Sequence, residues 1–343
     1  MKILVIQKKR IGDVLVSTII FEALRKKFPK AELHYLVYSM SLAVVENNPF
    51  IDKLIILDNK TKKSLWKMMQ FLYKLRKQNY DVVVDAYGKP NSVLMGWFSG
   101  AKKTITFDKK YSKLLYSDVI HRRENPITNA TLAIEHRMQL LEPLGIDFAS
   151  YQPKIFLNDS EIEEAKKYLI SNGINLEIPI VMISAIGSKE SKTYPLEYMA
   201  AILNEIATKN VQILMNYIPF QKELAEELYG LCNAETQSKI FMDVYENDLR
   251  KFIAITSQCK ALIGNEGGAT HMAKSVKVPT FIIFAIGIIK ESWSIYENET
   301  TDVAISILDY FPGDDSDFET LTKKFKPALF LDKLKKFLEF NIK

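Results

Sequence analysis

The residues best suited to chemistry stand late in the chain, in a glycine-rich turn that carries an acid and an imidazole. Glu266 is followed by Gly267 and Gly268, and His271 comes one helical turn later. An apolar run precedes the turn and another follows the predicted helix. A helix N-terminus favours an anion, and glycines let the backbone approach it closely. The pattern predicts a phosphate site of the kind a nucleotide sugar needs, although an ordinary strand–turn–helix unit with paired glycines looks the same.

A second candidate loop follows the first residues of the chain. The apolar run 2–6 predicts a strand, and residues 16–28 predict a helix that ends at Pro29. Gly12 and Asp13 lie between them, at the carboxyl end of the strand. In open sheets of parallel strands, ligands bind at this edge. Asp13 is therefore either an acid that faces a ligand or a cap for the following helix, since Asp caps helices well.

The pattern along the chain alternates strand and helix in two sets. In the first set, strands are expected at 2–6, 33–37, 53–57 and 81–85, and helices at 16–27, 40–47 and 62–78. After an expected linker at 153–158, a capping box at 160–163 opens a helix that Gly173 ends. The second set has strands at 180–184, 211–216, 239–242, 261–263 and 280–284. Two such halves predict an α/β protein with two Rossmann-like domains on parallel sheets.

Three segments of the chain resemble glycosyltransferase family 9, the lipopolysaccharide heptosyltransferase family. Near the start, Arg10-Ile11-Gly12-Asp13 is similar to the Arg-x-Gly-Asp loop of the family. In the middle, a small-residue turn at 184–187 and then Lys192-Thr193-Tyr194-Pro195 are similar to its turn and Lys-x-Trp-Pro. Late in the chain, residues 266–273 are similar to its Asp-Ser/Thr-Gly-Pro-x-His-x-Ala. The segments occur in the order of the family and span residues 1 to about 285.

Four residues depart from the pattern of the family. Glu266 stands where many members have Asp, and Gly267 where they have Ser or Thr. Ala269 replaces the usual Pro, and Tyr194 the usual Trp. Because Glu is one methylene longer than Asp, a contact from Glu266 to a sugar or ribose hydroxyl would shift. The departures leave the identity of the donor open.

The resemblance implies the GT-B fold, in which two Rossmann-like domains face each other across a cleft. Residues 1–157 would bind the acceptor and residues 158–330 the nucleotide sugar, with a helix within 331–343 packing near the first domain. The implied reaction is inverting transfer of a sugar, heptose from ADP-heptose, to a lipopolysaccharide core or related glycan. No cofactor besides the nucleotide-sugar co-substrate is expected, and no metal, because a helix N-terminus and a lysine can take the place of a cation beside a diphosphate.

Such a transfer needs a base for the acceptor hydroxyl and positive groups for the leaving diphosphate. The resemblance implies Asp13 as the base and Lys192 as the charge that meets the diphosphate. Donor contacts are expected from Ser184, Ala185, Gly187, Glu266, Gly267, Gly268, Ala269 and His271. Acceptor contacts are expected from Lys9, Arg10, Gly12, Arg122, Arg123 and His136. The alternatives are solvated loop positions for the basic residues and core or capping positions for the histidines.

Charge is divided unevenly along the chain. Residues 1–157 contain 26 Lys and Arg and 14 Asp and Glu, a net charge of +12, whereas residues 158–343 contain 20 and 27, a net charge of −7. A basic half favours an anionic partner, here a glycolipid or a membrane surface. The basic stretch 60–77 has apolar residues at helical spacing, so it is either a membrane-surface helix or, more simply, a crossover helix with its lysines in water. No nucleic-acid-binding pattern accompanies the charge, so nucleic acid is not an expected partner.

Composition predicts a soluble, cytoplasmic protein. The two cysteines, Cys232 and Cys259, suit a reducing compartment and lack zinc-site spacing. The first strand runs directly into charged residues, which is not typical of a signal peptide. No apolar run reaches the roughly 18 residues that span a bilayer. We therefore expect a cytoplasmic protein with peripheral contact at the cytoplasmic face of the inner membrane.

Two other functions suit the same fold. A nucleotide-sugar epimerase or hydrolase binds a similar ligand between two such domains and needs no acceptor. A non-catalytic member of the family would keep nucleotide binding and lack transfer. A dinucleotide dehydrogenase is not expected, because the first loop has one glycine where G-x-G-x-x-G needs three.

Overall fold

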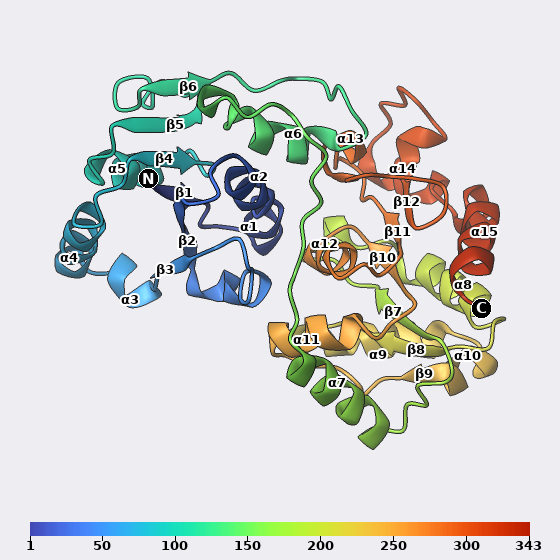
Figure 1. Cartoon of the computed structure of the whole chain (residues 1–343). Helices are drawn as coiled ribbons and strands as arrows, with labels where there is room; N and C mark the ends of the chain where they lie inside the picture. Colours follow the sequence, from blue (N-terminus) through green and yellow to red (C-terminus); the bar gives the residue numbers. More distant parts are fainter. The chain divides into compact units, whose positions relative to one another are not determined.

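The computed structural model describes all residues from 1 to 343 and divides the chain into two compact units. The first unit is Met1–Phe156 and the second is Leu157–Lys343. Each unit is built on one open sheet of six strands, and every strand pairing in both sheets is parallel. Figure 1 shows helices on both sides of each sheet. The predicted α/β class with two Rossmann-like halves is confirmed.

The sheet of the first unit has the strand order β3-β2-β1-β4-β5-β6. Its strands are β1 (Lys2–Ile6), β2 (Glu32–Tyr38), β3 (Lys53–Leu57), β4 (Val82–Asp85), β5 (Lys103–Phe107) and β6 (Asp118–Ile120). After β1 the chain proceeds toward one edge of the sheet, and after β4 it proceeds toward the other. The carboxyl ends of β1 and β4 therefore form a topological switch point, which is where open sheets of this kind bind ligands.

The helices of the first unit cover two faces with different side chains. They are α1 (Ile11–Val16), α2 (Ile19–Lys27), η1 (Ser39–Val44), α3 (Asn59–Lys62), α4 (Leu65–Arg76), α5 (Pro90–Phe98), α6 (Thr131–Gln139) and η2 (Glu142–Leu144). On one face, Leu72 and Leu75 of α4 and Met95 of α5 share a core with alternate strand residues such as Leu4 and Leu36. On the other face, Phe21 of α2 packs on Tyr35 of β2, with ring centroids 4.7 Å apart.

Two predicted helices of the first unit are each divided by a pair of residues. The helix expected over 16–27 is interrupted after Val16, where α1 ends, and α2 starts at Ile19. The break lies at Ser17 and Thr18, whose hydroxyls donate to the carbonyls of Asp13 and Leu15 at 2.8 and 2.7 Å. The helix expected over 62–78 is α3 and α4, because the Ser64 hydroxyl caps α4 by accepting the Lys67 N–H. The segment expected as a helix over 40–47 is the short 3-10 helix η1.

The sheet of the second unit repeats the topology of the first, in the order β12-β11-β10-β7-β8-β9. Its strands are β7 (Ile180–Ser184), β8 (Gln212–Met215), β9 (Ile240–Phe241), β10 (Ala261–Asn265), β11 (Thr280–Ile283) and β12 (Asp302–Ile305). Its helices are α7 (Asp159–Ser171), η3 (Glu190–Lys192), α8 (Leu196–Ile206), η4 (Pro219–Gln221), α9 (Lys222–Leu231), α10 (Ala234–Lys239), α11 (Leu249–Thr256), α12 (Gly268–Ser275), α13 (Lys290–Trp293), η5 (Ile307–Asp309), α14 (Phe318–Lys324), η6 (Pro327–Leu329) and α15 (Leu331–Asn341). The switch point of this sheet lies between β7 and β10.

Three strands and one helix cap differ from the sequence expectation. The strands β5, β6 and β12 lie outside the predicted set, since β5 mixes Lys and Thr with its apolar residues and the other two are only three and four residues long. The capping box of α7 begins two residues earlier than expected. Asn158 accepts the Glu161 N–H and Glu161 accepts the Asn158 N–H, at 2.9 and 2.8 Å.

The final helix belongs to the core of the second unit. Phe337 and Leu338 of α15 are fully buried in one cluster with the strand residues Val181, Ile263 and Phe281. The rings of Phe281 and Phe337 lie 5.7 Å apart. The helix is thus an integral part of the second unit, and the expectation that residues 331–343 form a segment separate from this domain is wrong.

No helix in either unit combines the length and the apolar character that crossing a bilayer requires.

We expect Gly264→Ala to destabilise the second unit strongly. Gly264 lies inside β10 at a φ of +138°, and an added Cβ would lie 2.2 Å from the backbone oxygen of Ser184. Backbone strain and the clash together should lower the free energy of unfolding by more than about 2 kcal/mol. Urea denaturation measures the change. Gly230→Ala is the matched control, since that glycine lies in α9 with open space around it and should gain stability. A loss equal in both variants would contradict the explanation.

Candidate functional site

The switch point of the first unit holds Asp13 in a fixed orientation. Asp13 Oδ1 accepts a hydrogen bond from Arg137 Nη2 of α6 at 2.6 Å. Arg137 is itself held by the Ser17 hydroxyl and by the carbonyl of Ala133, at 3.3 and 3.1 Å. The other carboxylate oxygen, Oδ2, accepts no hydrogen bond. One oxygen of the acid is therefore anchored, and the other is available to a ligand.

Asp13 does not cap a helix. The helix α1 begins at Ile11, its N-cap residue is Arg10, and the Asp13 side chain accepts no backbone N–H. Asp13 thus lies in the first turn, beside the unpaired N–H groups. Arg10 adopts a φ of +59°, a conformation that costs a residue other than glycine about 1–3 kcal/mol. The sequence alternative that Asp13 serves as a cap is wrong, and the turn before it is strained.

Arg122 interacts electrostatically with this acid and forms no ion pair with a carboxylate of its own. Its guanidinium lies 3.9 Å from the centroid of the Phe107 ring. Partial burial lowers the pKa of Arg122, the charge of Arg137 lowers it further, and the charge of Asp13 raises it. Arg122 and Arg137 therefore place two guanidinium groups near one carboxylate, an arrangement that favours an anionic ligand.

The neighbouring candidates Arg123 and His136 are already engaged within the unit. Arg123 Nη2 donates to Glu142 Oε1 at 3.2 Å, and its Nη1 lies 3.9 Å from the buried Glu135. His136 Nε2 donates to the carbonyl of Arg123 at 2.8 Å, and burial lowers its pKa. These contacts hold the Arg122 segment in place. Lys9 and Arg10 are exposed and form no ion pair, and Gly12 lies in the first turn of α1.

The structure adds a buried pair, Lys8 and Asp85, which lie outside the predicted site residues. Lys8 follows β1 and Asp85 ends β4, so they lie on the two sides of the switch point. Lys8 Nζ donates to Asn91 Oδ1 at 3.0 Å and lies 5.9 and 5.5 Å from the ring centroids of Tyr38 and Tyr87. A sequence signal exists, because Lys8 comes two residues after one apolar run and Asp85 closes another. Their nearness depends on the strand order, which local sequence patterns do not determine.

Burial shifts the pKa of both members of this pair toward neutrality. It lowers the pKa of Lys8 to about 8, an effect that the charge of Asp85 partly offsets. It raises the pKa of Asp85 to about 6, against the hydrogen bonds that Asp85 accepts from the Gly88 and Tyr87 N–H groups at 3.0 and 3.1 Å. Titratable groups perturbed in this way gather at functional sites.

In the second unit, the Asn265 side chain joins the three segments that carry the sequence motifs. Its Oδ1 accepts the Tyr194 N–H at 2.9 Å. Its Nδ2 donates to the carbonyls of Ala185 and Ser184, at 2.5 and 3.3 Å. The amide thus ties the turn after β7, the Lys192 loop and the turn after β10 to one another. Asn265 directly precedes Glu266 in the chain, and its place in the sequence does not reveal this role.

Hydrogen bonds from neighbouring segments hold the Lys192 loop in place, and the ammonium group of Lys192 stays unpaired. Lys192 ends η3 and forms no hydrogen bond or ion pair through its ammonium group. The Gly187 N–H donates to the Thr193 hydroxyl at 3.0 Å, and Gln221 Nε2 donates to the Gly187 carbonyl at 3.0 Å. A Cβ at Gly187 would lie 2.3 Å from the backbone oxygen of Lys192. Glycine is therefore required there for the close approach of the two segments.

The turn after β10 has the geometry of a helix N-terminus beside an acid and an imidazole. Gly267 precedes α12 in extended backbone, and its N–H donates to the Thr270 hydroxyl at 3.3 Å. His271 Nε2 lies 3.5 Å from Glu266 Oε1, and its ring lies 5.7 Å from that of Trp293. Gly268 and Ala269 occupy the first turn of α12, where N–H groups have no intrahelical acceptor. These N–H groups at the start of α12 are able to bind a phosphate.

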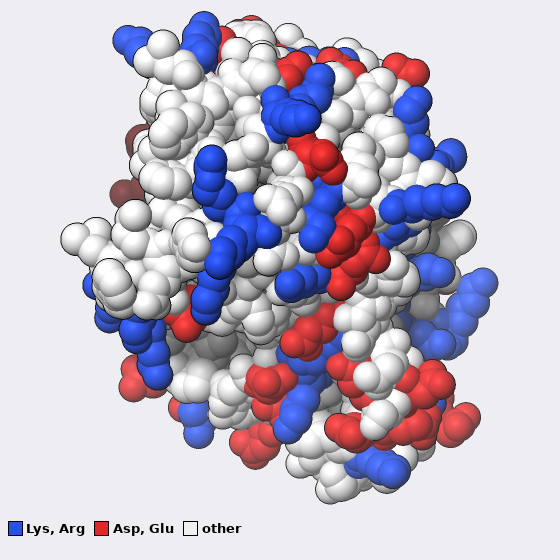
Figure 2. Space-filling view, turned by 60° about the vertical axis from the view of Figure 1, so that its left-hand side comes forward, with Lys and Arg blue, Asp and Glu red and all other residues white.

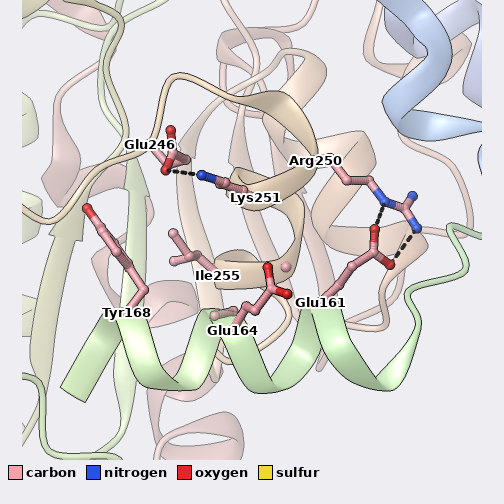
Figure 3. Close-up of a pocket in the computed structure, with 9 residues that line it drawn as sticks. Glu161, Glu164, Tyr168, Glu246, Arg250, Lys251 and Ile255 are labelled. Carbon is pink, nitrogen blue, oxygen red and sulfur yellow. Dashed lines mark hydrogen bonds and ion pairs between the residues drawn. The ribbon is translucent and has the colours of Figure 1, made fainter. Parts of the chain in front are cut away.

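A separate cavity of about 150 Å³ lies between α7 and α11 (Figure 3). Four of its five charged side chains are paired with one another, and the fifth, Glu164, accepts a hydrogen bond from the Ser160 hydroxyl at 3.0 Å. Arg250 contacts both carboxylate oxygens of Glu161, at 2.6 and 3.0 Å, and Lys251 lies 3.8 Å from Glu246. The cavity holds none of the motif residues, so the donor site is not placed there. No group of three His, Cys, Asp or Glu side chains in the chain is arranged to hold a metal ion.

Solved structures share this architecture over nearly the whole chain. A glycosyl transferase of family 9 from Veillonella parvula superposes with a TM-score of 0.82 at 16% identity, covering 98% of this chain and 97% of that one. The structure described as E. coli ADP-heptose lps heptosyltransferase II superposes with a TM-score of 0.74 at 16% identity, covering 99% of each chain. Two parallel sheets of this order, each with its motifs at the switch point, define a protein of the GT-B fold.

The chain belongs to glycosyltransferase family 9 (heptosyltransferase), whose model matches residues 68–297. Among curated proteins, the lipopolysaccharide heptosyltransferase 1 of Campylobacter coli is 24% identical over 325 residues, which is 93% of this chain and 94% of that protein. The lipopolysaccharide heptosyltransferase 3 of Escherichia coli is 20% identical over 80% of each chain. The family resemblance inferred from the three motifs is confirmed, and the protein is a glycosyltransferase.

We expect one lysine of this protein to titrate near pH 8. The candidate is Lys8, because burial lowers its pKa to about 8 from 10.5. NMR of the lysine Cε carbons across pH 6–11 should show one resonance with this midpoint in the wild type and none in Lys8→Met. A lysine population with midpoints only near 10.5 would contradict the assignment.

The same burial predicts how stability depends on pH. The unfolded chain keeps the Lys8 proton up to about pH 10.5, whereas the folded protein releases it near pH 8. The penalty of about 3 kcal/mol, at about 1.4 kcal/mol per pH unit, is fully present below pH 8 and is relieved as the pH rises toward 10.5. Between those values the wild type should gain stability relative to Lys8→Met in urea denaturation. A constant difference between the two proteins would contradict this linkage.

Proposed function

We propose that the protein transfers a sugar, heptose from ADP-heptose, to a hydroxyl of a lipopolysaccharide core or related anionic glycan, with inversion at the anomeric carbon. Support for the donor and acceptor comes from the family and from what its relatives are called. Curated relatives bear the name lipopolysaccharide heptosyltransferase. A solved structure of the same fold is described as E. coli heptosyltransferase with ADP-2-deoxy-2-fluoro heptose, at 16% identity.

The observation that carries the proposal is the state of Asp13. Arg137 holds Oδ1 at 2.6 Å, while Oδ2 has no partner. In the proposed reaction, Oδ2 takes the proton of the acceptor hydroxyl as the acceptor oxygen attacks the anomeric carbon. The bond from that carbon to the diphosphate breaks on the opposite side, which inverts the configuration. Arg122 and the exposed Lys9 and Arg10 supply charge for an anionic acceptor.

The leaving nucleoside diphosphate carries the electron pair of the broken bond. We assign its stabilisation to the free ammonium group of Lys192 and to the N–H groups of Gly268 and Ala269 at the start of α12. Glu266 and His271 would contact the sugar or the phosphates, and the turn from Ser184 to Gly187 the nucleotide. With these groups in place we expect no metal ion and no cofactor beyond the nucleotide sugar. The glycolipid acceptor would be met at the cytoplasmic face of the membrane.

Two single variants separate the two proposed roles. Asp13→Asn should lower the rate of transfer by about 10²–10⁴-fold, the usual contribution of a general base, and should leave nucleotide affinity unchanged. Lys192→Ala should weaken ADP binding at least about tenfold, since a charged hydrogen bond contributes roughly 1.5–3 kcal/mol. Calorimetry with ADP, UDP and GDP measures the affinity, and radiolabelled sugar transfer measures the rate.

The matched control for Lys192 is Lys189→Ala, an exposed lysine of the same loop that should bind ADP as the wild type does. Near-normal turnover of folded Asp13→Asn would refute the base assignment. Tighter binding of UDP or GDP than of ADP would refute the ADP-linked donor while leaving a glycosyltransferase. Sugar turnover that needs no acceptor would refute transfer and favour hydrolysis or epimerisation.

A further inference from the structure

The helix α4 carries apolar side chains on two faces, and only one of them is covered. Met68, Phe71, Leu72 and Leu75 pack on the sheet of the first unit. Leu65, Trp66, Met69 and Tyr73 point away from it and are 88, 72, 54 and 60% exposed. At 3.6 residues per turn, these four side chains lie within about 100° of the helix circumference. They therefore form one continuous strip, which we call the α4 outer strip.

The neighbouring helix extends this apolar surface. The helix α5 contacts α4 and shares its core cluster. On α5, Leu94 and Trp97 lie one turn apart and are each about half exposed. Single exposed apolar residues need no explanation, but large contiguous apolar patches mark interaction sites. The exposed residues of these two packed helices include two tryptophans and a tyrosine, a composition typical of the boundary between lipid and water.

The α4 outer strip lies within a segment that has only positive charge. Residues 59–80 contain no Asp or Glu and seven basic residues, which are Lys60, Lys62, Lys63, Lys67, Lys74, Arg76 and Lys77. None of these forms an ion pair with a carboxylate, and Lys77 instead lies 4.6 Å from the ring centroid of Tyr73. Figure 2 brings this side of the first unit forward and shows Lys and Arg side chains beside broad uncharged surface. The unneutralised charge calls for an anionic partner.

The strip begins at the edge of the sheet that carries the candidate acceptor residues. The helices α3 and α4 follow β3, so the first turn of α4 lies at the carboxyl ends of the parallel strands. Contacts link this region to the switch point. Lys62 Nζ lies 5.6 Å from the Tyr38 ring centroid, and Lys8 Nζ lies 5.9 Å from the same centroid. Whatever binds the start of α4 therefore lies on the side of the unit where Asp13 stands.

We propose that the α4 outer strip, with Leu94 and Trp97 of α5, docks on an anionic lipid bilayer. Leu65, Trp66 and Met69 enter the boundary between headgroups and acyl chains, and the lysines of residues 60–77 contact the lipid phosphates. The binding itself is independent of sugar transfer. Its purpose rests on the proposed function, because docking at this edge would bring a membrane-held glycolipid acceptor to Asp13.

A bilayer explains the surface better than a folded protein partner does. A protein interface depletes lysine at its centre, whereas an interfacial membrane helix combines lysines on its polar side with Trp, Leu and aromatic residues on the other. The charge is also spread along the whole length of α3 and α4, as a surface of uniform negative potential would require.

The test measures cosedimentation of the full-length protein with vesicles of phosphatidylcholine, with and without phosphatidylglycerol. Two double variants address the two contributions: Leu65→Ser with Trp66→Ser, and Lys63→Glu with Lys67→Glu. All four side chains are exposed, so the fold should be retained. We expect wild-type binding only to the anionic vesicles, weakened by salt, and at least about tenfold weaker binding for each double variant.

Matched controls come from the same unit. Leu114→Ser changes a leucine as exposed as Leu65, and Lys26→Glu with Lys30→Glu reverses two exposed lysines of α2 and the following turn. Both controls should bind the vesicles as the wild type does. Asp13→Asn should lose transfer and keep vesicle binding, and the Leu65 and Trp66 variant should lose vesicle binding and keep transfer to a soluble acceptor.

Three results would overturn the proposal. Equal binding to neutral and anionic vesicles would remove the role of charge. Wild-type binding by both double variants would place the membrane surface elsewhere. A concentration-dependent dimer in sedimentation, abolished by Leu65→Ser with Trp66→Ser and accompanied by no vesicle binding, would assign the strip to a second copy of the chain. A failure of transfer alone would count against the proposed function and not against the docking surface.

Discussion

The candidate sites of this protein lie where two neighbouring strands connect to opposite sides of the sheet. In the first sheet the chain leaves β1 toward β2 and leaves β4 toward β5, and in the second it leaves β7 toward β8 and β10 toward β11. Between each diverging pair the backbone groups and side chains at the strand ends remain uncovered. The Asp13 loop stands at the first of these points, and the Ser184 and Glu266 turns stand at the second. The two units thus repeat one topological solution with different side chains.

Each switch point is organised by one buried polar side chain at the end of the corresponding strand. Asp85 ends β4 and accepts the N–H groups of its own following turn, whereas Asn265 ends β10 and bonds to two other segments. The difference has a physical consequence. A neutral amide can donate and accept, so it can join separate loops at no cost in charge. A buried carboxylate only accepts, and its burial is compensated in part by Lys8 nearby.

The sequence predicts much of this molecule because its strands are short apolar runs and its motifs follow them directly. The strands β1, β3 and β7 occur over the predicted residues, and the Lys192 and Glu266 turns lie at the strand ends as expected. What it does not predict depends on contacts between distant segments. The partner of Asp13 is Arg137, 124 residues away, and the burial of Lys8 follows from its nearness to β4. Local hydrogen bonds also matter. The Ser17 and Thr18 hydroxyls bond to backbone carbonyls at the break between α1 and α2, and the apolar periodicity does not predict that break.

The helix α4 shows a different limit of pattern analysis. Its apolar residues predict one amphipathic face, but Leu65 and Met69 belong to the exposed side, with Trp66 and Tyr73, while Leu72 and Leu75 belong to the core. Periodicity identifies a helix without saying how many of its faces are covered. The topology adds what the pattern lacks. In a unit of parallel strands, the helix after a strand starts at the ligand-binding edge and runs back along the sheet. The first turn of α4, with its exposed apolar side chains and its lysines outside any ion pair, therefore lies at the same strand ends as the Asp13 loop.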